Sequence, residues 1–118
     1  MLPQRFEVGP RSSQAVVHAG TVHVCGQVAR NSEGKNAALQ TTEILARIDE
    51  LLALAGSDKA KLISTIVWLS DFRHFEAMNA VWEAWVVPGQ TPARAVVESK
   101  LTAPGFVVEI MVTAAVAV

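Results

Sequence analysis

The stretch that decides the fold is VVEIMVTAAVAV, residues 107–118. Successive side chains of a β-strand point to opposite faces, and both faces of this stretch are mostly apolar. A strand that is apolar on both sides is covered on both sides in the folded protein. The stretch therefore predicts a long closing strand over residues 107–118. One face is formed by Val108, Ile110, Val112, Ala114 and Val116, and the other by Val107, Met111, Ala115 and Ala117 with Glu109 and Thr113 among them.

Upstream of this strand, the hydrophobic pattern predicts five further strands and two helices. Strands are expected at residues 4–8, 14–19, 21–29, 62–69 and 94–98, with a hairpin turn at Gly20. Asn36 is the expected N-cap of the first helix and Gly56 its C-terminal cap; Ser70 or Asp71 caps the second, which ends at residues 87–89. This order predicts one α+β domain, residues 1–118, with a mixed six-stranded sheet and both helices on one face. The uncovered face then needs another subunit.

Composition narrows the class of protein further. The chain has 118 residues, of which 51% are hydrophobic and 18% charged, with a formal net charge of −1. This balance excludes disorder, and without a basic stripe no nucleic-acid partner is expected. Apolar runs are too short to span a membrane, and the first ten residues do not resemble a signal peptide. The single cysteine, Cys25, permits no internal disulfide, so a cytoplasmic location is expected.

Two charged residues interrupt the apolar strands, Arg94 and Glu109. Charged side chains are rarely buried unless they are paired or have a function. A guanidinium binds a carboxylate through two parallel hydrogen bonds, and a glutamate can act as general base toward water. If the two strands are neighbours, the pair could form a site for a small carboxylate substrate. The residues alone leave open a buried Arg94–Glu109 ion pair that only stabilises an interface.

The remaining polar residues have plainer interpretations. His23 is expected to be a partly exposed strand residue, and Cys25 a small packing residue rather than a nucleophile. Gly26 marks a bulge or a close approach of the backbone to another group. The Asn79 side chain either forms hydrogen bonds with the backbone or reaches a ligand. No metal site is expected, because no histidines, cysteines and carboxylates stand at ligand spacing.

The order and spacing of several short segments resemble the Rid family, the reactive intermediate (imine) deaminases, also called the YjgF family. The resemblance covers nearly the whole chain. It rests on residues 9–10 with 13–16, 24–28, 40–41, 55–56, 75–79, 82–84, 92–94 and 108–110. Cys25 stands where serine is common and Val96 where cysteine is common, and the usual aromatic residue after Gly9-Pro10 is missing. Residues 81–85 and 88–89 resemble a side branch of the family more than its best-known members.

The resemblance implies a fold, an activity and roles for individual residues. The fold would be chorismate-mutase-like, in a homotrimer whose sheets form a barrel with clefts between subunits. The activity would be the cofactor-independent hydrolysis of 2-imino acids (imine and enamine intermediates) to 2-oxo acids and ammonia. Arg94 would anchor the substrate carboxylate and Glu109 would activate water, with Cys25, Gly26, Asn79 and Val96 lining the substrate site. The alternative is a trimer that binds a small metabolite, or regulates a partner, without turnover.

Overall fold

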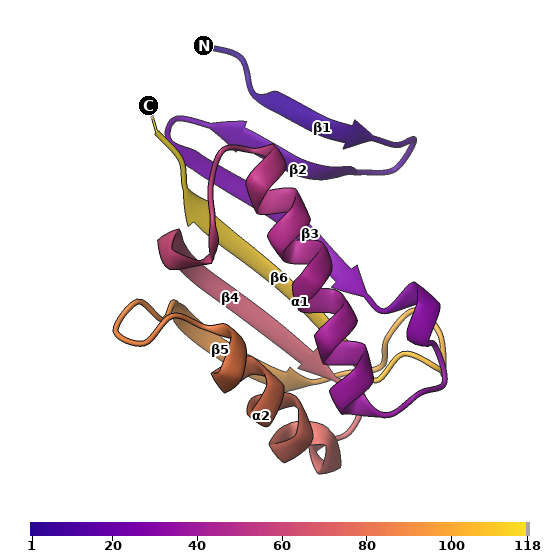
Figure 1. Ribbon diagram of the computed structural model, residues 1–118. Coiled ribbons are helices and arrows are strands. Elements are labelled where there is room, and N and C mark those ends of the chain that lie inside the picture. The colour runs from indigo at the N-terminus through magenta and orange to yellow at the C-terminus, as the bar shows by residue number, and fades with distance from the viewer. Residues whose placement is uncertain (118) are drawn as a thin grey trace.

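The structure, a computed structural model, describes residues 1–117 and contains one mixed sheet (Figure 1). The strand order is β1-β2-β3-β6-β4-β5, and every neighbouring pair is antiparallel except the parallel pair β4–β5. The strand that closes the sequence, β6, thus lies inside the sheet between β3 and β4. The strands are β1 (Gln4–Val8), β2 (Ser13–His18), β3 (Thr21–Val28), β4 (Leu62–Leu69), β5 (Ala93–Glu98) and β6 (Val108–Ala115).

The helices begin and end close to the predicted caps. Helix α1 (Ala37–Leu54) starts after Asn36, whose Oδ1 accepts a hydrogen bond of 2.9 Å from the Leu39 N–H. Beyond its end, Gly56 has φ +82°, the left-handed conformation that favours glycine. Helix α2 (Phe75–Trp85) differs from prediction, because Asp71 caps a 3₁₀ turn (Phe72–His74) that precedes it.

Both helices pack on the same face of the sheet, which confirms the predicted α+β fold (Figure 1). The alternation of β6 is the reason, since its even-numbered residues are fully buried against the helices. Met78 and Trp82 bring the apolar stripe of α2 into the same core. The buried residues of β6 are Val108, Ile110, Val112 and Ala114.

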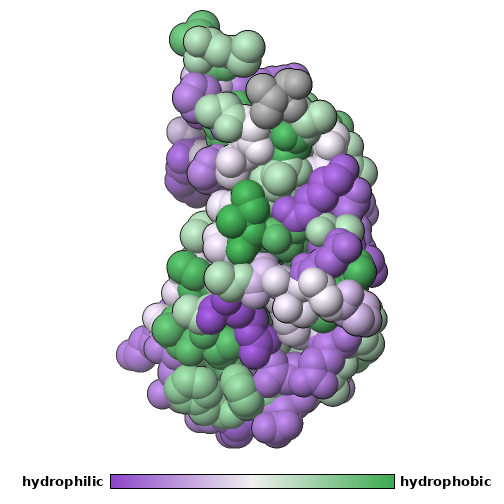
Figure 2. All heavy atoms as spheres, turned by 90° about the vertical axis from the view of Figure 1, so that its left-hand side faces the viewer, coloured by the Kyte–Doolittle hydropathy of each residue, from purple (hydrophilic) through white to green (hydrophobic). Residues whose placement is uncertain are grey.

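No described element covers the opposite face of the sheet. The odd-numbered residues of β6 are only half-buried there, and Ile63 and Val97 remain 48% and 39% exposed. In Figure 2 the outline of the molecule is hollowed on the side turned away from the helices, with apolar residues around the hollow. We call this surface the open face. Its half-buried β6 residues are Glu109, Met111, Thr113 and Ala115.

The last strand is shorter than predicted. It begins at Val108 rather than Val107, because the Val107 N–H donates to Gln40 Oε1 at 2.9 Å instead of to a strand. It ends at Ala115, and beyond this end the Val116 N–H donates to the Gly20 carbonyl at 3.0 Å. The predicted end, Val118, lies outside the described residues.

Gln40 ties helix α1 to the chain that leads into β6. Its side chain is fully buried and makes three hydrogen bonds, donating to the carbonyls of Lys35 (3.0 Å) and Gly105 (2.8 Å) and accepting from the Val107 N–H. Buried polar groups that lose their partners are costly. Gln40 therefore holds the loop between β5 and β6 in place.

Replacing Gln40 by leucine is expected to destabilise the protein by about 3 kcal/mol, because its side chain makes three hydrogen bonds, each worth about 1 kcal/mol. Urea unfolding at fixed protein concentration measures the change. Gln90→Leu is the matched control, since Gln90 is exposed and surface substitutions change stability by no more than about 0.5 kcal/mol. Equal unfolding midpoints for the two variants would contradict the assigned role.

Candidate functional site

Glu109 occupies the middle of the open face. In β6 it pairs with Val28 of β3 on one side and with Trp68 of β4 on the other. Its neighbours Val108 and Ile110 point into the core, so its carboxylate points away from the helices. Burial raises the pKa of the Glu109 carboxyl above its ordinary value. A carboxyl with a raised pKa in a concave site is a candidate for acid–base chemistry.

The β3 strand is irregular where it passes Glu109. Its register with β6 shifts between Val24 and Gln27, which confirms the bulge predicted at Gly26. The close approach predicted there is also present, because a Cβ on Gly26 would lie 2.1 Å from Glu109 Oε2. Only a glycine leaves the carboxylate its observed position.

Cys25, beside this glycine, belongs to a small polar cluster. Its Sγ lies 3.5 Å from Gln14 Oε1, and Gln27 Nε2 donates to Gln14 Oε1 at 2.9 Å and to the Cys25 carbonyl at 3.1 Å. Burial is the main cause that raises the pKa of the Cys25 thiol. A raised pKa disfavours the thiolate that a nucleophile needs, in agreement with its interpretation as a packing residue.

Arg94 lies on the edge strand β5 and is held by helix α2. Its Nη1 donates to Asn79 Oδ1 at 2.8 Å, and its guanidinium carbon lies 5.5 Å from the centre of the Trp82 ring. Both partners are neutral, and no described carboxylate lies within 4.0 Å of the guanidinium. Partial burial lowers the pKa of Arg94 from its ordinary value, against the attraction of Glu83, yet an arginine stays charged at neutral pH.

Within one chain, Arg94 and Glu109 do not meet. Strand β4 lies between β5 and β6, so the condition under which the two residues would converge within one sheet is not met. Arg94 pairs with Thr65, which is buried on the helix side, whereas Glu109 pairs with Trp68 on the open face. The two side chains therefore point to opposite faces. The two residues therefore form no ion pair within one chain, and the ion pair at an interface that the sequence had left open could join only Arg94 and Glu109 of different chains.

The other predicted site residues divide between these two places. Asn79 and Val96 lie with Arg94, since Asn79 bonds it and Val96 follows two residues later on the same side of β5. Gly26 lies against Glu109, and Cys25 precedes it in the same bulge with its Sγ turned to Gln14 and Gln27. His23 is exposed on the open face, opposite Thr113, as expected. The candidate site thus consists of two halves, one at the edge of the sheet and one on its open face.

A cavity of about 280 Å³ adjoins the Glu109 half. It adds residues that the sequence had not singled out, above all Trp68 and Lys100. The alternation of β4 places Trp68 on the open face, which is a signal that the sequence contains. Lys100 sits in a loop without periodicity, so no pattern marked it. The cavity is lined by Trp68, Ser99, Lys100, Leu101, Thr102 and Glu109.

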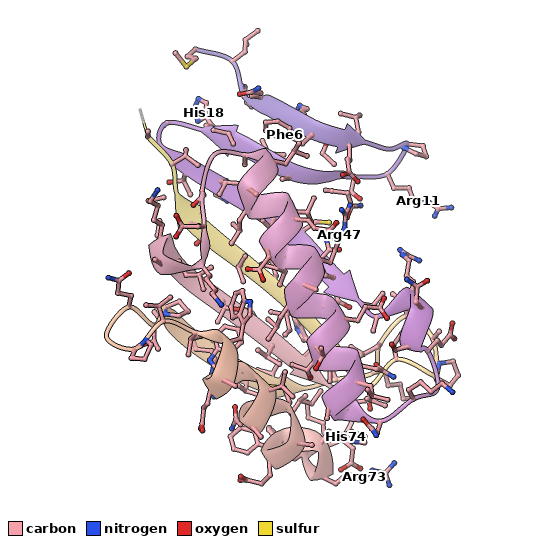
Figure 3. The ribbon with its side chains drawn as sticks, viewed as in Figure 1. Phe6, Arg11, His18, Arg47, Arg73 and His74 are labelled. Carbon is pink, nitrogen blue, oxygen red and sulfur yellow. The ribbon has the colours of Figure 1, made fainter. Side chains whose placement is uncertain are left out.

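A larger cavity, about 690 Å³, lies between α1 and the β1–β2 hairpin and contains neither Arg94 nor Glu109. Its charged groups largely neutralise one another. Arg47 bonds Glu7 and Glu50, as the position of Arg47 facing the hairpin in Figure 3 illustrates, and Glu43 accepts from the Ser32 hydroxyl. The Arg94 and Glu109 side chains form no ion pair among the described residues, so they are the better candidates for a functional site.

Neither a metal centre nor a membrane segment is indicated by the described residues. Among residues 1–117, no group of three or more histidine, cysteine, aspartate and glutamate side chains is arranged to hold a metal ion. None of the helices described is long and apolar enough to cross a membrane.

The sequence of this chain matches a known protein family over nearly its whole length. The family described as Endoribonuclease L-PSP matches residues 4–116. The RutC family protein YoaB of Escherichia coli K12 is 38% identical over 112 residues, which cover 95% of this chain and 96% of that protein. A RutC family protein of Haemophilus ducreyi is 36% identical over 112 residues, or 95% of each.

Solved structures agree with this placement. NMB1025 of Neisseria meningitidis, a member of the YjgF protein family, has a TM-score of 0.95 and 43% identity, with 100% of this chain and 98% of that chain covered. A protein of the Rid family from Yersinia pestis, YyfA, has a TM-score of 0.83 and 29% identity over 92% of this chain and 90% of its own. The chain belongs to the YjgF/RutC family, which is the Rid family that its sequence motifs resemble.

Proposed function

We propose that this protein hydrolyses 2-imino acids to 2-oxo acids and ammonia. The observation that carries the proposal is the Arg94 guanidinium, which is held at the sheet edge by two neutral partners and keeps its charge available. A planar guanidinium binds a carboxylate through two parallel hydrogen bonds. The partly buried Glu109 carboxylate supplies the base that the hydrolysis needs.

The two halves come together if the active unit is a homotrimer. The open face is apolar and uncovered, which supports an interface there. An edge strand that docks on the open face of the next chain makes a heterologous contact, and such contacts form a ring when the rotation from chain to chain closes after three copies. Arg94 and Asn79 of one chain would then face Glu109 and Gly26 of the next, with one site at each of the three interfaces.

In this site, each residue has a defined task. Arg94 holds the substrate carboxylate, so that the imine carbon lies beside a water bound to Glu109. As the water oxygen bonds to the carbon of the protonated imine, Glu109 accepts one water proton and the C=N bond becomes the C–N bond of a carbinolamine. Glu109 passes this proton to the amine nitrogen. The C–N bond then breaks as the carbinolamine hydroxyl gives its proton to Glu109, which passes it to the departing ammonia, so that ammonium and a 2-oxo acid leave and the carboxylate is restored. Backbone groups of Cys25, Gly26 and Val96 would hold the water or the nitrogen.

Hydrolysis of a 2-imino acid needs no cofactor, because the imine carbon is already electrophilic. Positioning the water and stabilising charge are the contributions expected of the protein. A reducing compartment such as the cytoplasm suits the free Cys25 thiol.

Ammonia release from an imine made in place by an amino-acid oxidase tests the proposal. The purified protein is expected to accelerate ammonia release above the oxidase control, and Arg94→Ala is expected to lose most of this rate. Arg73→Ala is a matched control, because Arg73 is exposed on a different element. No acceleration over the control would overturn the enzymatic proposal. Binding of a 2-oxo acid without turnover would instead support the alternative of a metabolite-binding trimer.

A further inference from the structure

The Glu109 cavity is closed on one side by a loop that contains the exposed Lys100. The loop passes from β5 to β6, and its residues Ser99 to Thr102 face Trp68 and Glu109 across the cavity. Lys100 also lines a neighbouring cavity of about 320 Å³ with Pro104 and Phe106. The segment from Lys100 to Thr102 is thus the wall between two small cavities.

This wall is held in a defined position at both ends. The Ser99 N–H donates to the carbonyl of Leu69, the last residue of β4, at 2.9 Å, and the Ser99 hydroxyl donates to the Lys100 carbonyl at 3.2 Å. At the other end, the buried Gln40 side chain binds Gly105 and Val107. A loop fixed in this way positions its side chains before a ligand arrives, which lowers the entropic cost of binding.

The two charged side chains around the cavity, Lys100 and Glu109, form no ion pair among the described residues. No carboxylate among the described residues lies within 4.0 Å of the Lys100 ammonium. Lys100 and Glu109 line the same cavity without forming an ion pair, so the ammonium is available to an anionic group.

We infer that Lys100 selects 2-imino acids whose side chain ends in a second carboxylate. This inference rests on the proposed function. A substrate with its first carboxylate at Arg94 of one chain and its imine carbon at Glu109 of the next extends its side chain into the adjoining cavity. There the Lys100 ammonium and the hydroxyls of Ser99 and Thr102 would donate charge-assisted and neutral hydrogen bonds to a carboxylate. An apolar side chain of equal length would leave the ammonium without a partner.

Two imines of equal carbon number test the inference. L-Glutamate oxidase generates 2-iminoglutarate from L-glutamate, and an L-amino-acid oxidase generates 2-iminopentanoate from L-norvaline. The wild type is expected to favour 2-iminoglutarate in kcat/KM by about fivefold, the factor that an ion pair of an exposed lysine supplies. Lys100→Met, which retains an unbranched side chain, is expected to bring this ratio close to one. Lys35→Met is the matched control, since Lys35 is an exposed lysine outside the cavity and should leave the ratio as in the wild type.

The outcomes separate this inference from the proposed function. Turnover of both imines without preference, or a preference that Lys100→Met does not change, overturns the role of Lys100 and leaves the deaminase proposal standing. Absence of turnover with either imine contradicts the deaminase. In that case, titration with 2-oxoglutarate and 2-oxopentanoate, followed by NMR or calorimetry, decides the inference. Tighter binding of 2-oxoglutarate that is lost in Lys100→Met supports it, and equal affinities overturn it.

Discussion

Mixed oligomers of Arg94→Ala and Glu109→Gln chains are expected to recover about one quarter of wild-type activity, although each variant alone is inactive. The structure provides the reason, since the two side chains point to opposite faces of one sheet with β4 between their strands. In a ring, each site takes Arg94 from one chain and Glu109 from the next. With equal amounts of both chains, about a quarter of the interfaces join two intact residues.

The recovery is measured as ammonia release after the two variants are unfolded together and refolded, with mass spectrometry to show that mixed oligomers form. The control is Arg94→Ala mixed with the Arg94→Ala/Glu109→Gln double variant. Those oligomers contain no intact Arg94 and should stay inactive. If mixed oligomers form and remain inactive, Arg94 and Glu109 do not share a site between chains, and the proposed assembly is wrong.

Gly26→Ala is expected to reduce kcat/KM by about 100-fold, because a displacement of a catalytic group by about 1 Å has this effect. The added methyl group would lie 2.1 Å from Glu109 Oε2 and 3.1 Å from its Cδ, so the carboxylate must turn away. The displaced atoms are the end of a flexible side chain, so the fold can yield at little cost. Gly26 is also not among the residues with positive φ, and alanine can adopt its backbone conformation. The free energy of unfolding should fall by no more than about 1 kcal/mol.

A double-mutant cycle in unfolding free energy shows whether the methyl group added by Gly26→Ala acts on the Glu109 carboxylate. When the glutamate is already replaced, in Glu109→Ala, the added methyl meets no carboxylate. The cost of Gly26→Ala in unfolding free energy should then disappear. A cost that is the same in both backgrounds would show that the methyl group disturbs the β3 bulge itself, and not the carboxylate.

Much of the local structure follows from short-range patterns. The cap at Asn36, the glycine after α1 and the turn at Gly20 each depend on neighbouring residues, and all are present as predicted. The interruption at Gly26 was also predictable, because a glycine inside a strand marks a bulge or a close approach. The start of α2 was not predictable. Asp71 caps the 3₁₀ turn that precedes α2, and a capping residue can begin such a turn as well as an α-helix.

The sequence by itself determined the α+β class, the two-sided apolar strand β6 and the residue types of the candidate site. These properties follow from side-chain alternation and helical spacing, which depend on near neighbours in the chain. Only the tertiary structure decided where the site residues lie. The parallel pairing of β4 with β5 separates Arg94 from Glu109, and the loop held by Gln40 brings Lys100 to the Glu109 cavity. Both depend on contacts between segments far apart in the chain, which no local pattern specifies.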